Sequence, residues 1–314
     1  MTTIAIIGAG LIGRAWAFVF ARAGMDVRVW DPAADVLDRL SDDLAAMVEK
    51  AQLVGRAGAD PDRLVDRVRP FADLGEALHG ADLVQESGPE NLSVKQSLFT
   101  ELDRLAPAEA VIASSSSAIV VSLYTEGLAG RGRCLVGHPV NPPHLVPIVE
   151  LSPGPDTTSD ALDTAERIYA AAGQVPVRLA REIDGFVLNR LQAVVLAEAL
   201  RLVDEGIVTP QGVDDTIRHG LGRRWAFMGP FETISLNAPG GIPDYLERYG
   251  PMMARLADGC ARGEAFTPQA AHKVAAAFGP RPTPTQVRAQ QEWRDGELAA
   301  LDRHLADRRA ASSI

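Results

Sequence analysis

The chain has 314 residues, of which 46% are apolar and 23% charged, and its formal net charge is −10 with a pI near 5.1. This composition is ordinary for a globular protein and argues against a disordered chain, while the acidic charge argues against nucleic acid or an anionic membrane as partner. The length suffices for about two domains.

The cysteine count and the hydropathy exclude further classes of protein. Only Cys134 and Cys260 occur, so neither a disulfide framework nor a zinc cluster is available, and we expect no metal site. No apolar run approaches the roughly 18 residues of a membrane-spanning helix. The N-terminal apolar stretch lacks the preceding basic region of a signal peptide, so we expect none. The low cysteine count suits a reducing cytosol, and we expect a cytoplasmic protein without membrane partners.

The first elements in chain order form a recognisable unit. An apolar run at 4–7 predicts a strand, the sequence Gly8-Ala9-Gly10-Leu11-Ile12-Gly13 predicts a turn, and a helix is expected to follow up to residue 24. A second strand is expected at 27–30 and ends at Asp31. This order is the dinucleotide-binding fingerprint.

Each glycine of the turn has a physical role. Gly8 permits the tight turn, Gly10 lets the backbone approach a pyrophosphate, and Gly13 lets the helix pack close to the strand. The N–H groups of the helix N-terminus, around Leu11 and Ile12, and the positive end of the helix dipole favour an anion there. We therefore expect the cofactor's pyrophosphate at this position.

Asp31 indicates which dinucleotide binds. Its carboxylate can accept hydrogen bonds from both hydroxyls of an adenosine ribose and repels a 2′-phosphate. The following residues, Pro32-Ala33-Ala34, include no Arg or Lys that could bind such a phosphate. The sequence therefore favours NAD over NADP.

Further strands and helices alternate up to residue 184. Apolar residues at helical spacing predict helices at 34–52, 92–105 and 159–172. Short apolar runs predict strands at 81–86, 110–113, 133–137, 148–151 and 175–179. A turn is expected over 55–70, with a strand or short helix around Leu64 and Val65. This alternation predicts a Rossmann domain, a doubly wound and mostly parallel sheet, over residues 1–184.

The pattern changes to helices alone in residues 185–314, which we expect to form a second, all-helical domain. A long helix is predicted over 186–205, and another starts at Thr209-Pro210, with Thr as cap. We expect Gly220-Leu221-Gly222 to end that helix and the charged tail at 284–311 to be helical.

Polar residues at the strand ends are the candidates for chemistry. His138 ends a predicted strand, and Glu150 follows a proline-stiffened loop that can fold the chain back, so the carboxylate can reach the imidazole and stabilise an imidazolium. Ser117 and Asn189 offer groups that can hold a substrate oxygen. Taken singly, each is more simply explained by a structural role, Ser117 as a strand-end cap and Asn189 as a helix-start hydrogen bond.

Several segments together resemble the L-3-hydroxyacyl-CoA dehydrogenase superfamily. Besides the glycine turn, they are Glu90-Asn91-Leu92-Ser93-Val94-Lys95, Ser114 to Ser117, His138-Pro139-Val140-Asn141-Pro142 with Glu150, and Gly185-Phe186-Val187-Leu188-Asn189-Arg190. Three segments are most similar to its lambda-crystallin branch, which includes L-gulonate 3-dehydrogenase: residues 138–143, Gly220-Leu221-Gly222-Arg223-Arg224-Trp225-Ala226-Phe227 and Trp293-Arg294-Asp295.

The resemblance implies roles for individual residues. It implies His138 as the catalytic base, with Glu150 as its partner, and Ser117 and Asn189 as substrate contacts. It also implies that Glu90 and Lys95 lie near the nicotinamide half of NAD, and that the protein is a homodimer through its helical domain. The loop after His138 departs from the aromatic version usual in the acyl-CoA enzymes, which argues against a CoA substrate.

These features predict an NAD-dependent dehydrogenase that oxidises a 3-hydroxy acid, of the L-gulonate kind, to the 3-keto acid. Arg224 is expected to bind the substrate carboxylate. The alternative, that Arg223 and Arg224 are simply two solvent-exposed side chains on a loop, is about equally good. The alternatives are an L-3-hydroxyacyl-CoA or carnitine-type dehydrogenase, and a protein without turnover, either crystallin-like or NAD-sensing.

Overall fold

The computed structural model describes residues 2–53, 58 and 60–312, and the chain forms two compact units. The first comprises Met1–Val187 and Gln291–Ile314, and the second is Leu188–Gln290. Residues 291–314, which the sequence-based division placed with the helical domain, thus group with the first unit. An ion pair of 2.9 Å between Lys50 Nζ and Glu292 Oε1 is one of the contacts there.

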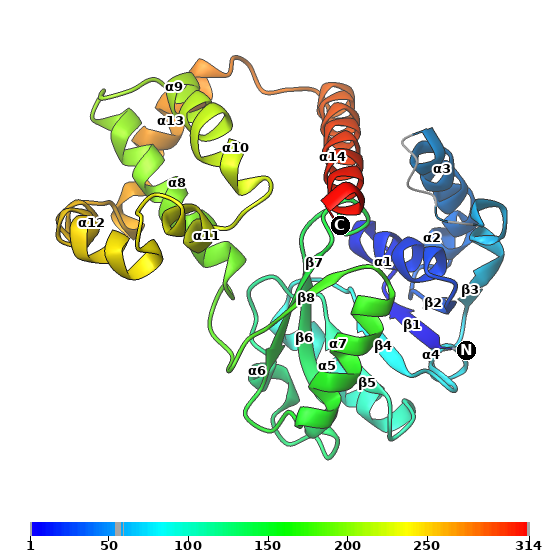
Figure 1. Cartoon of the computed structure of the whole chain (residues 1–314). Coiled ribbons are helices and arrows are strands. Elements are labelled where there is room, and N and C mark those ends of the chain that lie inside the picture. The colour runs from blue at the N-terminus through cyan, green and yellow to red at the C-terminus, as the bar shows by residue number, and fades with distance from the viewer. Residues whose placement is uncertain (1, 54–57, 59, 313–314) are drawn as a thin grey trace. The chain divides into compact units, whose positions relative to one another are not determined.

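An eight-stranded sheet with the order β3-β2-β1-β4-β5-β6-β7-β8 is the centre of the first unit (Figure 1). The strands are β1 (Thr3–Ile7), β2 (Asp26–Trp30), β3 (Val68–Phe71), β4 (Leu83–Glu86), β5 (Val111–Ser114), β6 (Cys134–Pro139), β7 (Ile148–Pro153) and β8 (Val175–Arg178). Neighbouring strands pair in parallel except for β6 and β7, which are antiparallel. The predicted doubly wound, mostly parallel sheet is confirmed.

The strand order creates a switch point between β1 and β4. From β1 the chain continues to β2 and β3 on one side, and then returns to place β4 on the other side of β1. In open α/β sheets, ligands bind outside the carboxyl ends of the strands at such a point. The glycine turn, which follows β1, lies at this edge.

Helices cover both faces of the sheet. Those of the first unit are α1 (Leu11–Arg22), α2 (Ala34–Asp38), α3 (Leu40–Leu53), α4 (Leu74–Leu78), α5 (Leu92–Leu105), α6 (Ser122–Thr125) and α7 (Ser159–Ala171), with the 3₁₀ turns η1 (Pro61–Arg63), η2 (Val65–Arg67) and η3 (Arg131–Arg133). Alternate residues of a strand point to opposite faces. Ile4 and Ile6 therefore join a core with α1, α3 and α7, whereas Ala5 and Ile7 join one with α5 and α6.

Three local expectations changed in this unit. The helix predicted at 34–52 is two helices, because the chain turns at Arg39 and starts again with Asp42 and Asp43 in the first turn, where acidic side chains favour a helix N-terminus. Strand β3 was not expected because it contains Pro70, which is tolerated since β3 is an edge strand. The expected turn over 55–70 includes residues 55–57 and 59, outside the described ranges, and η2 is its predicted short helix.

The described part of the second unit is helical, as expected. It comprises α8 (Leu188–Asp204), α9 (Pro210–Thr216), the π-helical turn η4 (Ile217–Leu221), α10 (Gly222–Trp225), α11 (Pro230–Ser235), α12 (Gly241–Asp258), η5 (Gly263–Ala265), α13 (Pro268–Ala277) and the start of α14 (Pro284–Ser312). Thr209 caps α9, its Oγ1 accepting the Gly212 N–H at 3.1 Å. Of the described helices, none is long and apolar enough to cross a membrane.

The prediction that Gly220-Leu221-Gly222 ends this helix is wrong. The chain stays helical from α9 through η4 into α10. Gly222 keeps right-handed helical angles, with φ −61° and ψ −30°. A Cβ at this position would lie 2.9 Å from the Ile217 carbonyl oxygen, so glycine here permits the wide π-turn instead of stopping the helix.

Candidate active site

The glycine turn between β1 and α1 forms the cofactor cradle. Gly8 has φ +101°, and a Cβ there would lie 2.8 Å from the Ser87 carbonyl oxygen, while a Cβ at Gly13 would collide with the Gly8 carbonyl oxygen. A Cβ at Gly10 would meet no atom within 4 Å, so the space beside it is open to a ligand. The residues present therefore fit a dinucleotide's pyrophosphate.

The start of α1 supplies the donors for that pyrophosphate. The N–H of Arg14 donates to the Gly10 carbonyl oxygen at 3.0 Å and begins the helical ladder. The preceding N–H groups, including those of Leu11 and Ile12, belong to the first turn, which has no intrahelical acceptors. Both residues lie where an anion would sit, and their contact with the pyrophosphate stays a prediction.

Asp31 follows β2 and holds the glycine turn in place. Its Oδ2 accepts the Ala9 N–H at 2.7 Å, and its Oδ1 accepts the Ala33 N–H at 2.9 Å. A carboxylate has about four lone-pair sites, so these two bonds leave acceptor capacity for ribose hydroxyls. The expected contact of Asp31 with the ribose stays a prediction. Its two bonds to backbone N–H groups show that Asp31 also has a structural role.

Lys95 is buried in a cluster with Glu86 and Ser114. The Lys95 ammonium lies 2.8 Å from Glu86 Oε2, 3.0 Å from Glu86 Oε1 and 3.3 Å from Ser114 Oγ. The two charged side chains are 1% and 0% exposed. Sequence reasoning missed Glu86, and its buried charge neutralises Lys95. The expected contact of Lys95 with the nicotinamide half of NAD stays a prediction.

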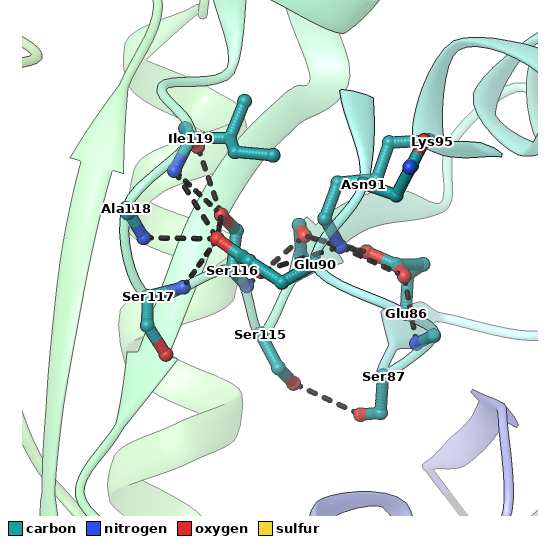
Figure 2. Close-up of polar contacts among 12 residues, drawn as sticks. Glu86, Ser87, Glu90, Asn91, Lys95, Ser115, Ser116, Ser117, Ala118 and Ile119 are labelled. Atoms are coloured by element: carbon teal, nitrogen blue, oxygen red, sulfur yellow. Dashed lines mark hydrogen bonds and ion pairs between the residues drawn. The ribbon is translucent and has the colours of Figure 1, made fainter. Parts of the chain in front are cut away.

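Glu90 joins the loop after β4 to the loop after β5. Its Oε1 accepts the Ser116 hydroxyl at 2.7 Å and the backbone N–H groups of Ser117, Ala118 and Ile119 at 3.2, 3.0 and 3.3 Å. Figure 2 shows the carboxylate reaching across to this loop, and the Ser117 hydroxyl pointing away from it. Glu90 therefore fixes the backbone of the loop that carries Ser117.

A second polar network lies beside the first at the ends of β4 and β5. The Ser115 hydroxyl lies 2.8 Å from Gln85 Nε2 and 2.9 Å from the Ser87 hydroxyl. The buried Tyr169 hydroxyl donates to Gln85 Oε1. Burial raises the pKa of Tyr169, so its phenol stays protonated and serves as a donor. Tyr169 of α7 thus holds Gln85 in place, and Gln85 in turn contacts Ser115 of the serine run.

His138 and Glu150 face each other across the antiparallel pair of β6 and β7. They are directly opposite in the register, and His138 Nδ1 lies 2.9 Å from Glu150 Oε2. Both side chains are buried. Because a carboxylate only accepts hydrogen bonds, Nδ1 carries the proton in the neutral form of the ring, and Nε2 is then the nitrogen with the lone pair. Glu150 Oε1 also accepts the Val187 N–H at 2.9 Å, a contact that sequence reasoning missed.

Asn189 and Arg224 belong to the second unit. Asn189 lies in the first turn of α8, and Arg224 is an exposed residue of α10. Their expected contacts with the substrate stay predictions. Of the candidate residues, the structure therefore brings His138 and Glu150 into direct contact and ties Glu90 to the loop of Ser117.

The glycine turn, the parallel sheet and the acid after β2 define a dinucleotide-binding protein of the dehydrogenase type. The NAD binding domain of 3-hydroxyacyl-CoA dehydrogenase matches residues 3–183, and the C-terminal domain of the same family matches residues 185–263. The chain belongs to the 3-hydroxyacyl-CoA dehydrogenase family, whose members act on 3-hydroxy groups with NAD. The expected family and cofactor are confirmed.

Individual relatives resemble the chain over most of its length. The lambda-crystallin homolog of Bos taurus is 42% identical over 304 residues, which are 95% of this chain and 94% of that protein. The L-carnitine dehydrogenase of Streptomyces griseus is 42% identical over 252 residues, 80% of this chain and 74% of that protein. The solved structure of 5-formyl-3-hydroxy-2-methylpyridine 4-carboxylic acid 5-dehydrogenase, an NAD+ dependent dismutase, has a TM-score of 0.83 at 29% identity and covers 98% of this chain and 99% of its own.

Proposed function

We propose that the protein oxidises the 3-hydroxyl group of a free hydroxy acid of the L-gulonate kind to the 3-keto acid, with NAD as hydride acceptor. The observation that carries this proposal is the buried contact between His138 Nδ1 and Glu150 Oε2, at 2.9 Å. A redox-sensing or purely structural NAD-binding protein needs no such pair at a strand end.

The pair suits removal of a proton from a hydroxyl group. When bound, NAD would supply the acceptor for the hydride of the substrate's hydroxyl-bearing carbon. His138 Nε2 would take the hydroxyl proton as the C–O bond becomes a carbonyl. The imidazolium that forms is stabilised by the Glu150 carboxylate, which also keeps the ring in its reactive tautomer. Ser117 and Asn189 are assigned to the substrate oxygen.

A free acid is the preferred substrate class for two reasons. Arg224 offers a guanidinium that can bind a carboxylate through two parallel hydrogen bonds. The similarity to an L-carnitine dehydrogenase also favours a free acid, since carnitine is a 3-hydroxy acid that carries its own carboxylate. An acyl-CoA thioester has no carboxylate near the reacting carbon.

The test is a turnover panel with NAD and four substrates: L-gulonate, L-carnitine, 3-hydroxybutyrate and L-3-hydroxybutyryl-CoA. We expect the highest kcat/KM with a free acid, and a loss of roughly 10²–10⁴-fold in kcat for His138→Gln with NAD affinity unchanged. Higher kcat/KM with the CoA thioester would assign the protein to the acyl-CoA branch. NAD binding without turnover of any of the four would refute the catalytic proposal and favour a crystallin-like or sensing role.

We propose further that the protein is a cytoplasmic homodimer, formed through the helical unit. Exposed apolar side chains on α8 and α12 support this, among them Leu191, Val194, Leu246, Met253 and Leu256. The presence of only two cysteines, both free, suits a reducing compartment. Sedimentation equilibrium is expected to give twice the chain mass, and a monomer would refute the dimer.

A further inference from the structure

Phe186 adopts a backbone conformation that is unfavourable for its residue type. Of the residues that the structure describes, it is the only one other than glycine with φ in the left-handed region, at +50°. Gly185 before it also has positive φ, at +72°, so the chain makes a tight turn here. A bulky L-residue holds such a conformation only where the surroundings enforce it, and such residues cluster at functional sites.

The turn directs two groups at the His138 and Glu150 pair. The fully buried Phe186 ring has its centroid 5.2 Å from that of the His138 imidazole. The next residue, Val187, donates its N–H to Glu150 Oε1 at 2.9 Å, while Glu150 Oε2 lies 2.9 Å from His138 Nδ1. Each oxygen of the carboxylate is therefore held, one by the turn and the other by the imidazole.

We propose that Phe186 is a positioning residue for the reaction, acting through Glu150. Its left-handed backbone aims the Val187 N–H at the carboxylate, which fixes the orientation of Glu150 and hence that of the imidazole. Its ring excludes water from one side of the pair, and a water-poor environment strengthens the hydrogen bond between Nδ1 and Oε2. The inference rests on the proposed role of His138 as base.

A merely structural role has to be separated from this one, because Phe186 is also part of a hydrophobic core. Phe99 belongs to the same core, is equally buried, and packs on Tyr124 with ring centroids 4.6 Å apart. Phe99→Ala is therefore a matched control for the loss of a buried aromatic ring. Both Ala variants are expected to lower the urea midpoint of unfolding by a similar amount.

The experiment measures single-turnover NADH formation with NAD and the preferred substrate of the panel, both at saturation. Phe186→Ala is expected to lower this rate constant roughly 10- to 100-fold, the scale of a misplacement of about 1 Å, while Phe99→Ala changes it less than about threefold. The double variant Phe186→Ala/Glu150→Gln should be no slower than Glu150→Gln alone, because residues that act through one another have non-additive effects.

A measurement without substrate tests the same inference. The His138 Nδ1–H proton, identified in ¹H NMR by its loss in His138→Gln, should exchange with solvent faster in Phe186→Ala than in Phe99→Ala. Equal exchange in the two, or rate losses for Phe186→Ala and Glu150→Gln that multiply in the double variant, would overturn the positioning role. If Phe186→Ala does not fold, Phe186→Leu replaces it, with a loss of roughly threefold or more expected.

Different results would refute the role of His138 as base and the role of Phe186 as positioning residue. If His138→Gln and Glu150→Gln leave the single-turnover rate unchanged, the proposed base is wrong, whatever Phe186 does. If both lower the rate but Phe186→Ala behaves like Phe99→Ala, the base stands and only the role of Phe186 falls.

Discussion

Replacing Glu86 with Gln is expected to destabilise the first unit strongly, because the buried Lys95 ammonium would then lose the nearer of its two carboxylate partners, the other being Glu90 Oε2 at 4.0 Å. The ammonium lies 2.8 Å from Glu86 Oε2, and the two side chains are 1% and 0% exposed. At that distance and an effective dielectric constant of about 20, the Coulomb attraction is about 6 kcal/mol. The Gln carbonyl oxygen can still accept a hydrogen bond from the Lys95 ammonium, but the negative charge is lost. Removing one charge of a buried pair typically costs about 3–5 kcal/mol, which is the loss we expect.

Urea unfolding monitored by circular dichroism measures this loss. Because the chain has two compact units, the transition of the first unit is identified by its shift when NAD is added. The control is Glu101→Gln, which breaks an exposed ion pair with Arg104 and should cost less than about 1 kcal/mol. Removing both charges in Glu86→Gln/Lys95→Met should restore part of the stability.

The reasoning would be refuted by either of two results. One is an unfolding free energy of Glu86→Gln equal to that of Glu101→Gln, which would mean that Lys95 finds water or another partner. The other is a double variant less stable than Glu86→Gln alone, which would mean that packing by Lys95, not its charge, dominates the energy of this cluster.

Three further predictions concern the cofactor, the substrate and the pH dependence. Asp31→Ala combined with Pro32→Arg removes the repulsion of a 2′-phosphate and adds a partner for it, so the kcat/KM ratio of NAD to NADP should fall at least about tenfold; an unchanged ratio means that Asp31 does not contact the ribose. Arg224→Met should raise KM for a free hydroxy acid roughly tenfold or more, the 1.5–3 kcal/mol of a charged hydrogen bond, with Kd for NAD unaltered; an unchanged KM would remove Arg224 from the site. Burial lowers the pKa of His144 from its ordinary 6.5 to about 4, so between these values the unfolded chain binds the extra proton. Stability is then lost as the pH falls from about 6.5 towards 4, by at most about 3 kcal/mol, and His144→Gln should make the unfolding free energy correspondingly less pH-dependent; equal slopes would contradict this.

The local parts of the fold were predictable because short-range physics determines them. The helix expected at 92–105 is α5 with those bounds, and its cap is Asn91, whose Oδ1 accepts the Val94 N–H at 3.1 Å. The turn of Gly8 and Gly13 could be predicted because the close approach of two backbone segments there excludes any Cβ.

The pairing of His138 with Glu150 was predictable only in outline. Twelve residues and a proline-rich loop allow the chain to fold back, but the sequence does not show that β7 runs antiparallel to β6, in a sheet whose other described strand pairs are parallel. In that register the two residues are directly opposite each other, and side chains of opposed residues meet on one face of the sheet.

Contacts that depend on packing between elements were not predictable. Glu86 reads as the end of a buried strand, and only the packing of α5 brings Lys95 to it. The four donors to Glu90 Oε1 come from a loop 26 to 29 residues away, whose shape depends on the serine run after β5. Val187 contributes through its backbone, so no property of its side chain could indicate the contact with Glu150.

The distribution of these residues over the two units has a consequence for specificity. The cofactor cradle, Asp31 and the His138 and Glu150 pair all come from the ends of strands in one sheet, whose positions are fixed by the hydrogen bonds between neighbouring strands. Asn189 and Arg224 are carried by helices of the other unit. In the proposed mechanism the strand ends of the first unit thus bind the cofactor, carry the base and contribute Ser117, whereas the helices of the second unit contribute Asn189 and Arg224 to substrate binding. Substitutions on α8 and α10 should therefore change the KM for one hydroxy acid relative to another without changing the affinity for NAD. The reason is that the substrate contacts proposed for these helices differ between hydroxy acids, whereas the NAD contacts at the strand ends do not.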